Sequence, residues 1–138
     1  MNAEQRMVTE FHERFGIARN ERPQWPGEDL HRIRVALIEE ELAEFRNAGD
    51  AESLVEVSDA LADLLYVVYG TAVTYGIDLE PIFREIHRSN MTKSGECERS
   101  RWDGKVSKGS SYEPPQIEPI LREQTGGLAA VGSGEAVS

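Results

Sequence analysis

Residues 37–70 read LIEEELAEFRNAGDAESLVEVSDALADLLYVVYG, two apolar stretches separated by a short polar segment that contains Gly49. Apolar residues recur at helical spacing on both sides of this glycine, which predicts helices over about 28–48 and 51–75. Because the connection is so short, the two helices are expected to pack antiparallel. A helical hairpin therefore forms the centre of the predicted fold.

Carboxylates interrupt the apolar pattern at regular spacings. At about 100° per residue, Glu41 and Glu44 continue the apolar face of the first helix of the hairpin. By the same geometry, Glu56, Asp59 and Asp63 fall on one face of the second helix. With helix axes roughly 8–10 Å apart, these faces approach each other. Carboxylates from two helices are therefore expected to meet.

Asp63 needs a partner, because leucines, valines and alanines surround it in the sequence and an unpaired buried carboxylate is destabilising. Arg32 or Arg34 would give a structural ion pair. A divalent cation bridging acids of both helices would give a metal site, and oxygen-only ligands favour Mg²⁺ or Mn²⁺. One acidic cluster is usually a solvated helix face, but two on consecutive inward faces favour the metal.

The rest of the pattern completes an all-α chain. Apolar spacing predicts further helices over about 4–15 and 78–90, with an irregular loop over 18–27. Asp50 and Asp78 are the expected N-caps of the third and fourth helices. The third helix is apolar nearly all round, which predicts burial at the centre of a bundle or in a subunit interface.

Regular pattern is expected to cease after residue 90. Residues 91–118 are rich in Gly, Ser, Lys and Pro, which predicts a long ordered loop or a short hairpin. With 138 residues the chain predicts one domain, over residues 1–121, followed by a flexible tail over 122–138.

Composition excludes several functional classes. A formal net charge of −10 disfavours binding to nucleic acid or to an anionic membrane surface. No run approaches the roughly 18 apolar residues of a membrane span, and the N-terminus lacks a signal-peptide pattern, so a cytoplasmic location is expected. Cys97 is the one cysteine, which excludes an internal disulfide and a thiolate metal cage.

The lysines gather late in the chain. All three, Lys93, Lys105 and Lys108, fall within sixteen residues, so the molecule has an acidic middle and a basic late segment. No phosphate-binding glycine loop, serine nucleophile or Cys-His arrangement can be built from the sequence. Nucleophilic catalysis by a side chain is therefore not expected.

The acidic motifs occur in a definite order: Glu40-Glu41-x-x-Glu44, then Glu56-x-x-Asp59, then Asp63-Leu-Leu-Tyr-Val-Val-Tyr-Gly. This order resembles that of the MazG-type all-α nucleoside triphosphate pyrophosphohydrolases and the related phosphoribosyl-ATP pyrophosphohydrolases. The resemblance continues through residues 85–93 and 103–115. It covers roughly residues 5–121 of the chain.

The resemblance implies a four-helix-bundle-like MazG-type fold with an irregular basic C-terminal arm, and a site built in a homodimer or homotetramer. It implies Mg²⁺-dependent hydrolysis of nucleoside triphosphates between the α and β phosphates, giving the monophosphate and pyrophosphate, as in housecleaning of nucleotide pools. The implied metal ligands are Glu41, Glu44, Glu56, Asp59 and Asp63, with Glu40 or Glu41 as the base. The implied substrate-binding residues are Arg88, Asn90, Lys93, Lys105 and Lys108.

One position departs from the family pattern. Ala60 stands where many relatives carry a glutamate three residues before the aspartate of the Asp-Leu-Leu-Tyr run. The ligands from the third helix therefore stay open between Glu56 with Asp59 and Asp59 with Asp63.

Alternative functions follow from the same residues. The runner-up enzyme is a phosphoribosyl-ATP pyrophosphohydrolase of histidine biosynthesis. A non-catalytic helical regulator would bind nucleotide without turnover, and a purely structural dimer would use its acids in ion pairs with arginines. Tyr66, Tyr69 and Trp25 could stack on a base, although aromatic residues in helices more often pack in a core.

Overall fold

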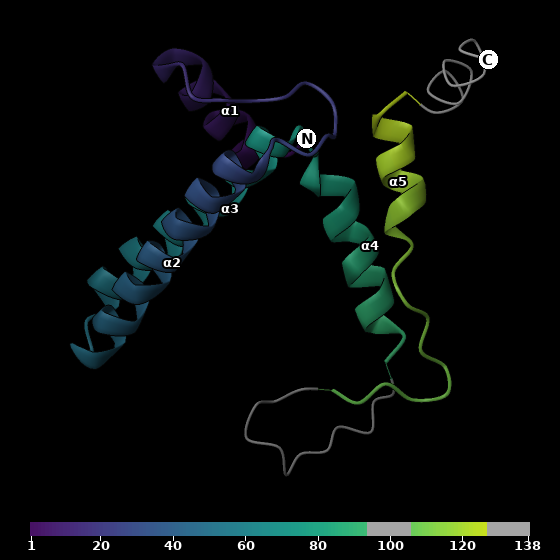
Figure 1. Cartoon of the computed structure of the whole chain (residues 1–138). Coiled ribbons are helices and arrows are strands. Elements are labelled where there is room, and N and C mark those ends of the chain that lie inside the picture. Colours follow the sequence, from purple (N-terminus) through teal and green to yellow (C-terminus); the bar gives the residue numbers. More distant parts are fainter. Residues whose placement is uncertain (94–105, 127–138) are drawn as a thin grey trace. The chain divides into compact units, whose positions relative to one another are not determined.

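The computed structural model describes residues 1–93 and 106–126, which form five helices and no strand. The helices are α1 (Ala3–Phe15), α2 (Glu28–Asp50), α3 (Leu54–Tyr75), α4 (Leu79–Met91) and α5 (Ile117–Gln124) (Figure 1). The chain divides into two compact units, Met1–Leu79 and Glu80–Ser138. The all-α prediction is confirmed, and a fifth helix follows the four that were expected.

The first unit is the predicted helical hairpin with α1 added to it. Helices α2 and α3 lie side by side, and α1 packs against α3 (Figure 1). Asn2 caps α1 by accepting a hydrogen bond from the Gln5 N–H at 3.0 Å. Helix α1 ends at Phe15 and is capped by Gly16, whose φ of 66° lies in the left-handed region that favours glycine.

The turn of the hairpin differs from the prediction. Helix α2 continues through Gly49, and Asp50 is its last residue rather than the cap of α3. Ser53 caps α3 instead, because its hydroxyl accepts a hydrogen bond from the Glu56 N–H at 3.3 Å. Serine followed three residues later by glutamate is the spacing of a capping box, a stronger signal than the isolated Asp50.

The loop before α2 closes over the C-terminal end of α3. Asn20 donates from its backbone N–H to Val73 O at 3.2 Å and from its side-chain amide to Thr74 O at 2.8 Å. The Gln24 N–H donates to Tyr75 O at 3.0 Å. These bonds satisfy carbonyls that the end of a helix leaves without partners.

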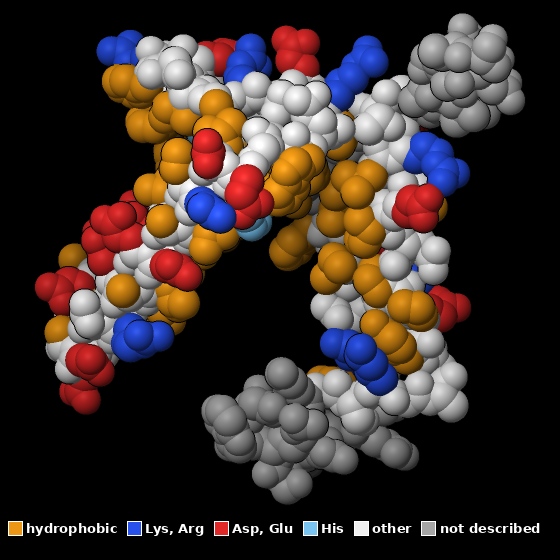
Figure 2. Space-filling model, viewed as in Figure 1, with side chains coloured by type: hydrophobic (Ala, Val, Ile, Leu, Met, Phe, Trp, Pro, Cys, Tyr) orange, Lys and Arg blue, Asp and Glu red, His pale blue; other side chains and the backbone are white. Residues whose placement is uncertain are grey.

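Large apolar side chains remain exposed on one side of α3. Small residues dominate the buried apolar set, which comprises Val8, Ala48, Ala60, Ala72 and Val73. By contrast, the side chains that we call the apolar face of α3 are 37% to 82% exposed: Leu54, Leu61, Leu65 and Val68. Figure 2 shows hydrophobic side chains on the surface of this unit. Within Met1–Leu79, the first half of α3 is therefore not at the centre of a bundle. The subunit interface stays a prediction.

The second unit consists of α4, an extended segment and α5. The segment over residues 106–116 is irregular, as predicted, whereas α5 was not predicted. Helix α5 ends three residues beyond the domain boundary expected at residue 121. Residues 94–105, which include Cys97 and Lys105, and residues 127–138 of the expected tail lie outside the described residues.

Within the described residues, no single helix combines the length and the hydropathy that crossing a membrane requires, although α3 and α4 taken as a bent pair pass that test of length and composition.

Candidate metal centre

Three carboxylates of the hairpin come together. Glu41 and Glu44 of α2 and Asp63 of α3 each offer one oxygen, and these three oxygens lie within 4.8 Å of one another. We call these residues the three-acid cluster. Residues three apart share one side of a helix, and the short turn brings α3 back along that side of α2. The approach of acids from two helices, expected from the spacing, is present in the structure.

Glu41 is the most constrained member of the three-acid cluster. Its Oε2 atom is buried and has no hydrogen-bond partner among the described residues. Burial, followed by the negative charges of Glu44 and Asp63, raises the pKa of Glu41 above its ordinary value. Glu40, the other candidate base, is exposed and stands outside the cluster. A cation beside Glu41 would relieve both the lost solvation and the repulsion.

The expected burial of the acids is wrong for most of the cluster. Glu41 is half-buried, but Glu44 and Asp63 are exposed. The leucines that flank Asp63 in the sequence are themselves exposed, Leu61 at 44% and Leu65 at 57%. Neighbours on a helix bury a side chain only where a second element covers them, and within Met1–Leu79 no element buries these leucines.

The ion-pair alternative for Asp63 does not form. Arg32 Nε lies 3.2 Å from Glu28 Oε1, one turn earlier on α2. Arg34 donates instead to the Thr71 hydroxyl and to the backbone carbonyl of Val67. Within the described residues, neither arginine neutralises Asp63.

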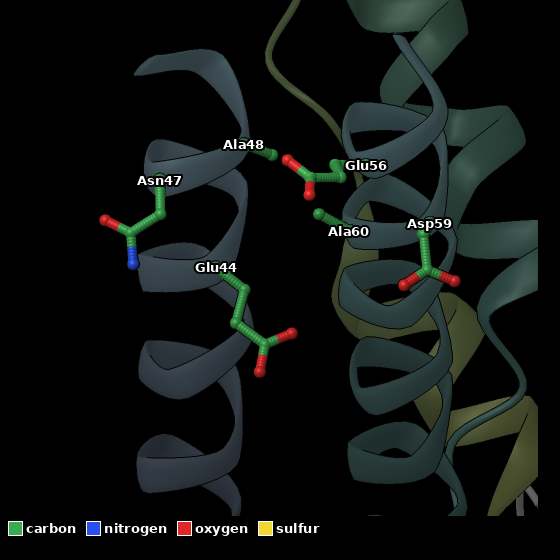
Figure 3. A pocket seen from close by; sticks show the side chains of 6 residues that line it. All are labelled: Glu44, Asn47, Ala48, Glu56, Asp59 and Ala60. Atoms are coloured by element: carbon green, nitrogen blue, oxygen red, sulfur yellow. The ribbon is translucent and has the colours of Figure 1, made fainter. Parts of the chain in front are cut away.

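A pocket adjoins the cluster between α2 and α3. Its walls are formed by Glu44, Asn47, Ala48, Glu56, Asp59 and Ala60. Figure 3 shows Glu44 and Glu56 extending from facing helices toward the space between them. Among the acids of α3, Asp63 thus joins Glu41 and Glu44, while Glu56 and Asp59 line the neighbouring pocket with Glu44. Asn47 was not predicted, although its spacing of three from Glu44 is the signal that could have indicated it.

The predicted phosphate-binding residues that the structure describes lie in the second unit. Arg88 is held by two carboxylates, with Nη2 2.8 Å from Glu85 Oε1 and Nη1 2.8 Å from Glu113 Oε2. These contacts raise the pKa of Arg88. The positive charge of Arg88 is therefore already neutralised by Glu85 and Glu113 within the second unit.

The lysines of this unit are less engaged. Lys108 Nζ lies 5.0 Å from the centre of the Tyr112 ring, a cation–π contact, and Lys108 is exposed. Lys93 is half-buried and Asn90 is exposed at the end of α4. Within the described ranges, neither Lys93 nor Lys108 forms an ion pair with an acid.

The aromatic residues divide into packing and exposed groups. The Tyr69 hydroxyl accepts a hydrogen bond from the Asn2 amide at 2.9 Å, and Tyr66 meets Phe11 edge-on at 5.5 Å between ring centres. Tyr69 thus contacts the cap of α1, and Tyr66 contacts α1 while remaining 40% exposed. Trp25 is 59% exposed and its ring lies 4.9 Å from that of His31, at the start of α2.

Comparison with known proteins adds family evidence to this geometry. A stretch of 49 residues is 43% identical to an uncharacterized protein of Acanthamoeba polyphaga mimivirus, and the match covers 36% of this chain and 20% of the viral protein. The sequence profile of the family described as phosphoribosyl-ATP pyrophosphohydrolase matches residues 8–90, more than half of the chain. That range contains the whole hairpin and confirms the superfamily that the acidic motifs predicted. The chain therefore belongs to the phosphoribosyl-ATP pyrophosphohydrolase family, a family of hydrolases.

Proposed function

We propose that this chain is a Mg²⁺-dependent nucleotide pyrophosphohydrolase that cleaves nucleoside triphosphates between the α and β phosphates and serves nucleotide-pool housecleaning. Family membership supports hydrolysis of a pyrophosphate bond in general. The observation that carries the metal dependence is the buried, unpartnered Oε2 of Glu41 inside a group of three carboxylates.

The donor set fits a hard divalent ion. Glu41, Glu44 and Asp63 supply only oxygen, which suits Mg²⁺ or Mn²⁺ and does not suit softer ions. When bound, such an ion would neutralise phosphate charge and lower the pKa of a bound water. Glu56 and Asp59, beside the cluster, are the available further ligands from α3.

The remaining steps belong to residues of the chain. Glu40 is exposed beside the cluster and would accept the proton of the attacking water. Lys93 and Lys108, which carry no acidic partner in the described part of the chain, would bind phosphate oxygens, with Lys105 in the same arm. Asn90 would bind the sugar or base. Arg88 would contribute mainly by holding the arm in place, because two glutamates already neutralise it.

The family match also favours a second candidate substrate, phosphoribosyl-ATP. Both reactions release pyrophosphate, so one assay separates them. Pyrophosphate release is measured over canonical and modified nucleoside triphosphates and phosphoribosyl-ATP, each with Mg²⁺ and with Mn²⁺. Turnover of triphosphates supports housecleaning, whereas turnover restricted to phosphoribosyl-ATP supports the histidine pathway. Binding of nucleotides without any turnover would instead identify a regulator.

Substitution of the cluster tests the metal site. Glu41→Gln and Asp63→Asn should each lower metal-dependent turnover by more than the roughly 10–100-fold that loss of an outer-shell partner costs. Glu39→Gln is the matched control, because Glu39 is exposed on the same helix and lies outside the three-acid cluster. Circular dichroism checks that the variants stay folded. Full activity of both cluster variants would exclude this site.

We also propose that the enzyme works as a homodimer or homotetramer. The exposed apolar face of α3 supports this assembly, because a helix that leaves large apolar side chains in water gains free energy when a second copy covers them. By helical geometry this face stands on the side of α3 opposite Glu56, Asp59 and Asp63, so pairing through it would leave the acids open to substrate.

A further inference from the structure

Arg34 occupies an unusual position between the helices of the hairpin. It is a residue of α2, is only 7% exposed, and reaches α3 through two hydrogen bonds. Its Nε donates to the Thr71 hydroxyl at 3.2 Å, and its Nη2 donates to the backbone carbonyl of Val67 at 3.0 Å. The Thr71 hydroxyl in turn donates to the same carbonyl at 2.8 Å. The guanidinium is therefore fixed to the backbone of α3.

No carboxylate offsets the burial of this cation. Within the described residues, Arg34 forms no ion pair, although ten acidic residues lie on α2 and α3 themselves. A buried charge without a counter-ion is costly, so a role in simple ion-pair stability does not account for it. The two groups that accept its hydrogen bonds, the Thr71 hydroxyl and the Val67 carbonyl, instead fix Arg34 at one level along the axis of α3.

The guanidinium group of Arg34 lies close against the backbone of α3 at Gly70. A Cβ on Gly70 of α3 would lie 2.3 Å from Arg34 Nη2 and 3.2 Å from His12 Nε2. Glycine at residue 70 thus allows the arginine to cross α3 closely. His12 of α1 is buried, and its Nδ1 lies 3.2 Å from the carbonyl of Ala18. Three helices therefore close around one guanidinium group.

The contact lies in line with the three-acid cluster. Arg34 precedes Glu41 by seven residues, which is two turns, or about 10 Å, along the same side of α2. Val67 follows Asp63 by four residues, about one turn along α3. A slide of α3 by one residue would move it about 1.5 Å and turn its face by about 100°. Such a slide would separate Asp63 from Glu41 and Glu44.

We propose that Arg34 is a positioning residue for the three-acid cluster: by bonding to Thr71 and to the carbonyl of Val67, it sets the register of α2 against α3 at which Glu41, Glu44 and Asp63 converge. The inference rests on the proposed function, because the cluster matters as a cation site. Arg34 itself contacts neither the ion nor the substrate.

Binding of Mn²⁺ to the folded protein, followed by electron paramagnetic resonance of the free ion, tests this role without any turnover. Replacing Arg34 removes both a positive charge and a positioning contact, and these two losses predict opposite changes in the affinity for Mn²⁺. Removing a nearby cation should by itself tighten binding of Mn²⁺. Loss of register should weaken it, and we expect the dissociation constant of Arg34→Met to rise about tenfold, as for an outer-shell partner.

Two further variants keep the arginine and its charge. Gly70→Ala forces the guanidinium to move, and Thr71→Val removes one of its two acceptors; both should also weaken Mn²⁺ binding, Thr71→Val the less. Thr71→Val changes little volume and keeps the test available if Arg34→Met does not fold. Gly49→Ala is the matched control, because a Cβ there meets nothing within 4 Å. It should bind Mn²⁺ as the wild type does.

The two levels of the hypothesis fail in different ways. Loss of Mn²⁺ binding in Glu44→Gln, with unchanged or tighter binding in Arg34→Met, Gly70→Ala and Thr71→Val, would retain the metal site and overturn the positioning role. A wild-type protein that binds no Mn²⁺, with or without nucleotide, would overturn the metal site and the positioning role together.

Discussion

The charged carboxylate of Glu41 destabilises the metal-free fold, although the proposed metal site requires it. Because burial and neighbouring acids raise its pKa, the folded state holds a proton more tightly than the unfolded chain does. Stability from this group is therefore fully present below the ordinary carboxyl pKa of 4.5 and is lost as the pH rises through the folded value. We expect Glu41→Gln to raise the melting temperature of the metal-free protein at neutral pH.

Calorimetric or fluorescence-monitored melting at several pH values checks this expectation. The gain in Glu41→Gln should shrink as the pH falls through the raised pKa of Glu41 and should vanish below 4.5, since the wild-type carboxyl is then neutral as well. Addition of Mg²⁺ should reverse the order, because an ion that binds only the folded wild type stabilises it by mass action. Equal melting temperatures at neutral pH would mean that Glu41 carries no such cost.

Gly76 is a second residue whose identity is set by its surroundings. Its φ is 73°, and a Cβ would lie 2.2 Å from the backbone oxygen of Arg22, in the loop that closes over α3. Gly16 has a similar φ of 66° at the end of α1, but a Cβ there meets nothing within 4 Å. Gly16→Ala should therefore cost only about 1 kcal/mol from backbone strain.

Gly76→Ala should cost more than Gly16→Ala, by roughly 1–3 kcal/mol, because the loop backbone must move as well. Urea denaturation of both variants measures the difference in the free energy of unfolding. If the two variants prove equally stable, the loop over residues 17–27 is not held against α3 as the structure indicates.

At the level of elements, two carboxylates hold the extended segment over residues 106–116 against α4: Glu85 accepts from the Gln116 N–H, and Glu113 pairs with Arg88. The Arg88 guanidinium and the Gln116 N–H lower the pKa of Glu85 to about 2. A group with a depressed pKa contributes stability that is present above its unfolded value of 4.5 and is lost as the pH falls toward 2. The attachment of this segment should therefore weaken over that range of pH.

Hydrogen exchange at the Gln116 amide reports on this attachment directly, because that N–H donates to Glu85 at 2.9 Å. Its protection factor should fall in Glu85→Gln at neutral pH, and in the wild type as the pH drops from 4.5 toward 2. Glu118→Gln is the control, since Glu118 pairs with Arg122 one turn along α5 and not with Gln116. The segment is also bonded to α4 through Glu113, whose carbonyl accepts from the Ser89 hydroxyl at 2.7 Å and whose N–H donates to the Thr92 hydroxyl at 2.8 Å. Unchanged protection in Glu85→Gln would show that these two bonds hold the segment without Glu85.

The sequence was enough to predict the elements whose signals are local. Four helices follow from apolar spacing. Gly16 and Gly76, the C-caps of α1 and α3, are local signals of the same kind. Helix α5 was missed because eight residues give too few turns for a periodic pattern, and Pro119 suggests a break although it is tolerated in a first turn.

Prediction of the candidate site failed for properties that depend on packing against other elements, such as the burial of a side chain and its hydrogen-bond partners. The approach of Glu41, Glu44 and Asp63 follows from two periodicities and a short turn, all local features. The exposure of Asp63 does not, because it depends on whether anything covers Leu61 and Leu65. The neutral hydrogen-bond partners of Arg34 could not be predicted from the sequence either, since an arginine near so many acids suggests an ion pair.

For the molecule as a whole, the apolar face of α3 determines the expected assembly. Fully burying a leucine side chain contributes about 1.5–3 kcal/mol, so covering this face with a second copy would add substantially to a small core. We expect sedimentation or light scattering to give two or four times the chain mass of 15.4 kDa. Placing a carboxylate at the centre of the face, as in Leu65→Glu, should shift the protein toward the monomer.

The control for this shift adds the same charge elsewhere on the hairpin. Ala36 is exposed on α2, and its helical neighbours Arg32, Glu39 and Glu40 are charged, so Ala36→Glu should leave the mass unchanged. Because the acids stand on the other side of α3, the monomeric Leu65→Glu protein should still bind Mn²⁺ through Glu41, Glu44 and Asp63. A wild-type chain that remains at 15.4 kDa over a series of dilutions, or a Leu65→Glu variant that assembles like Ala36→Glu, would refute pairing through this face.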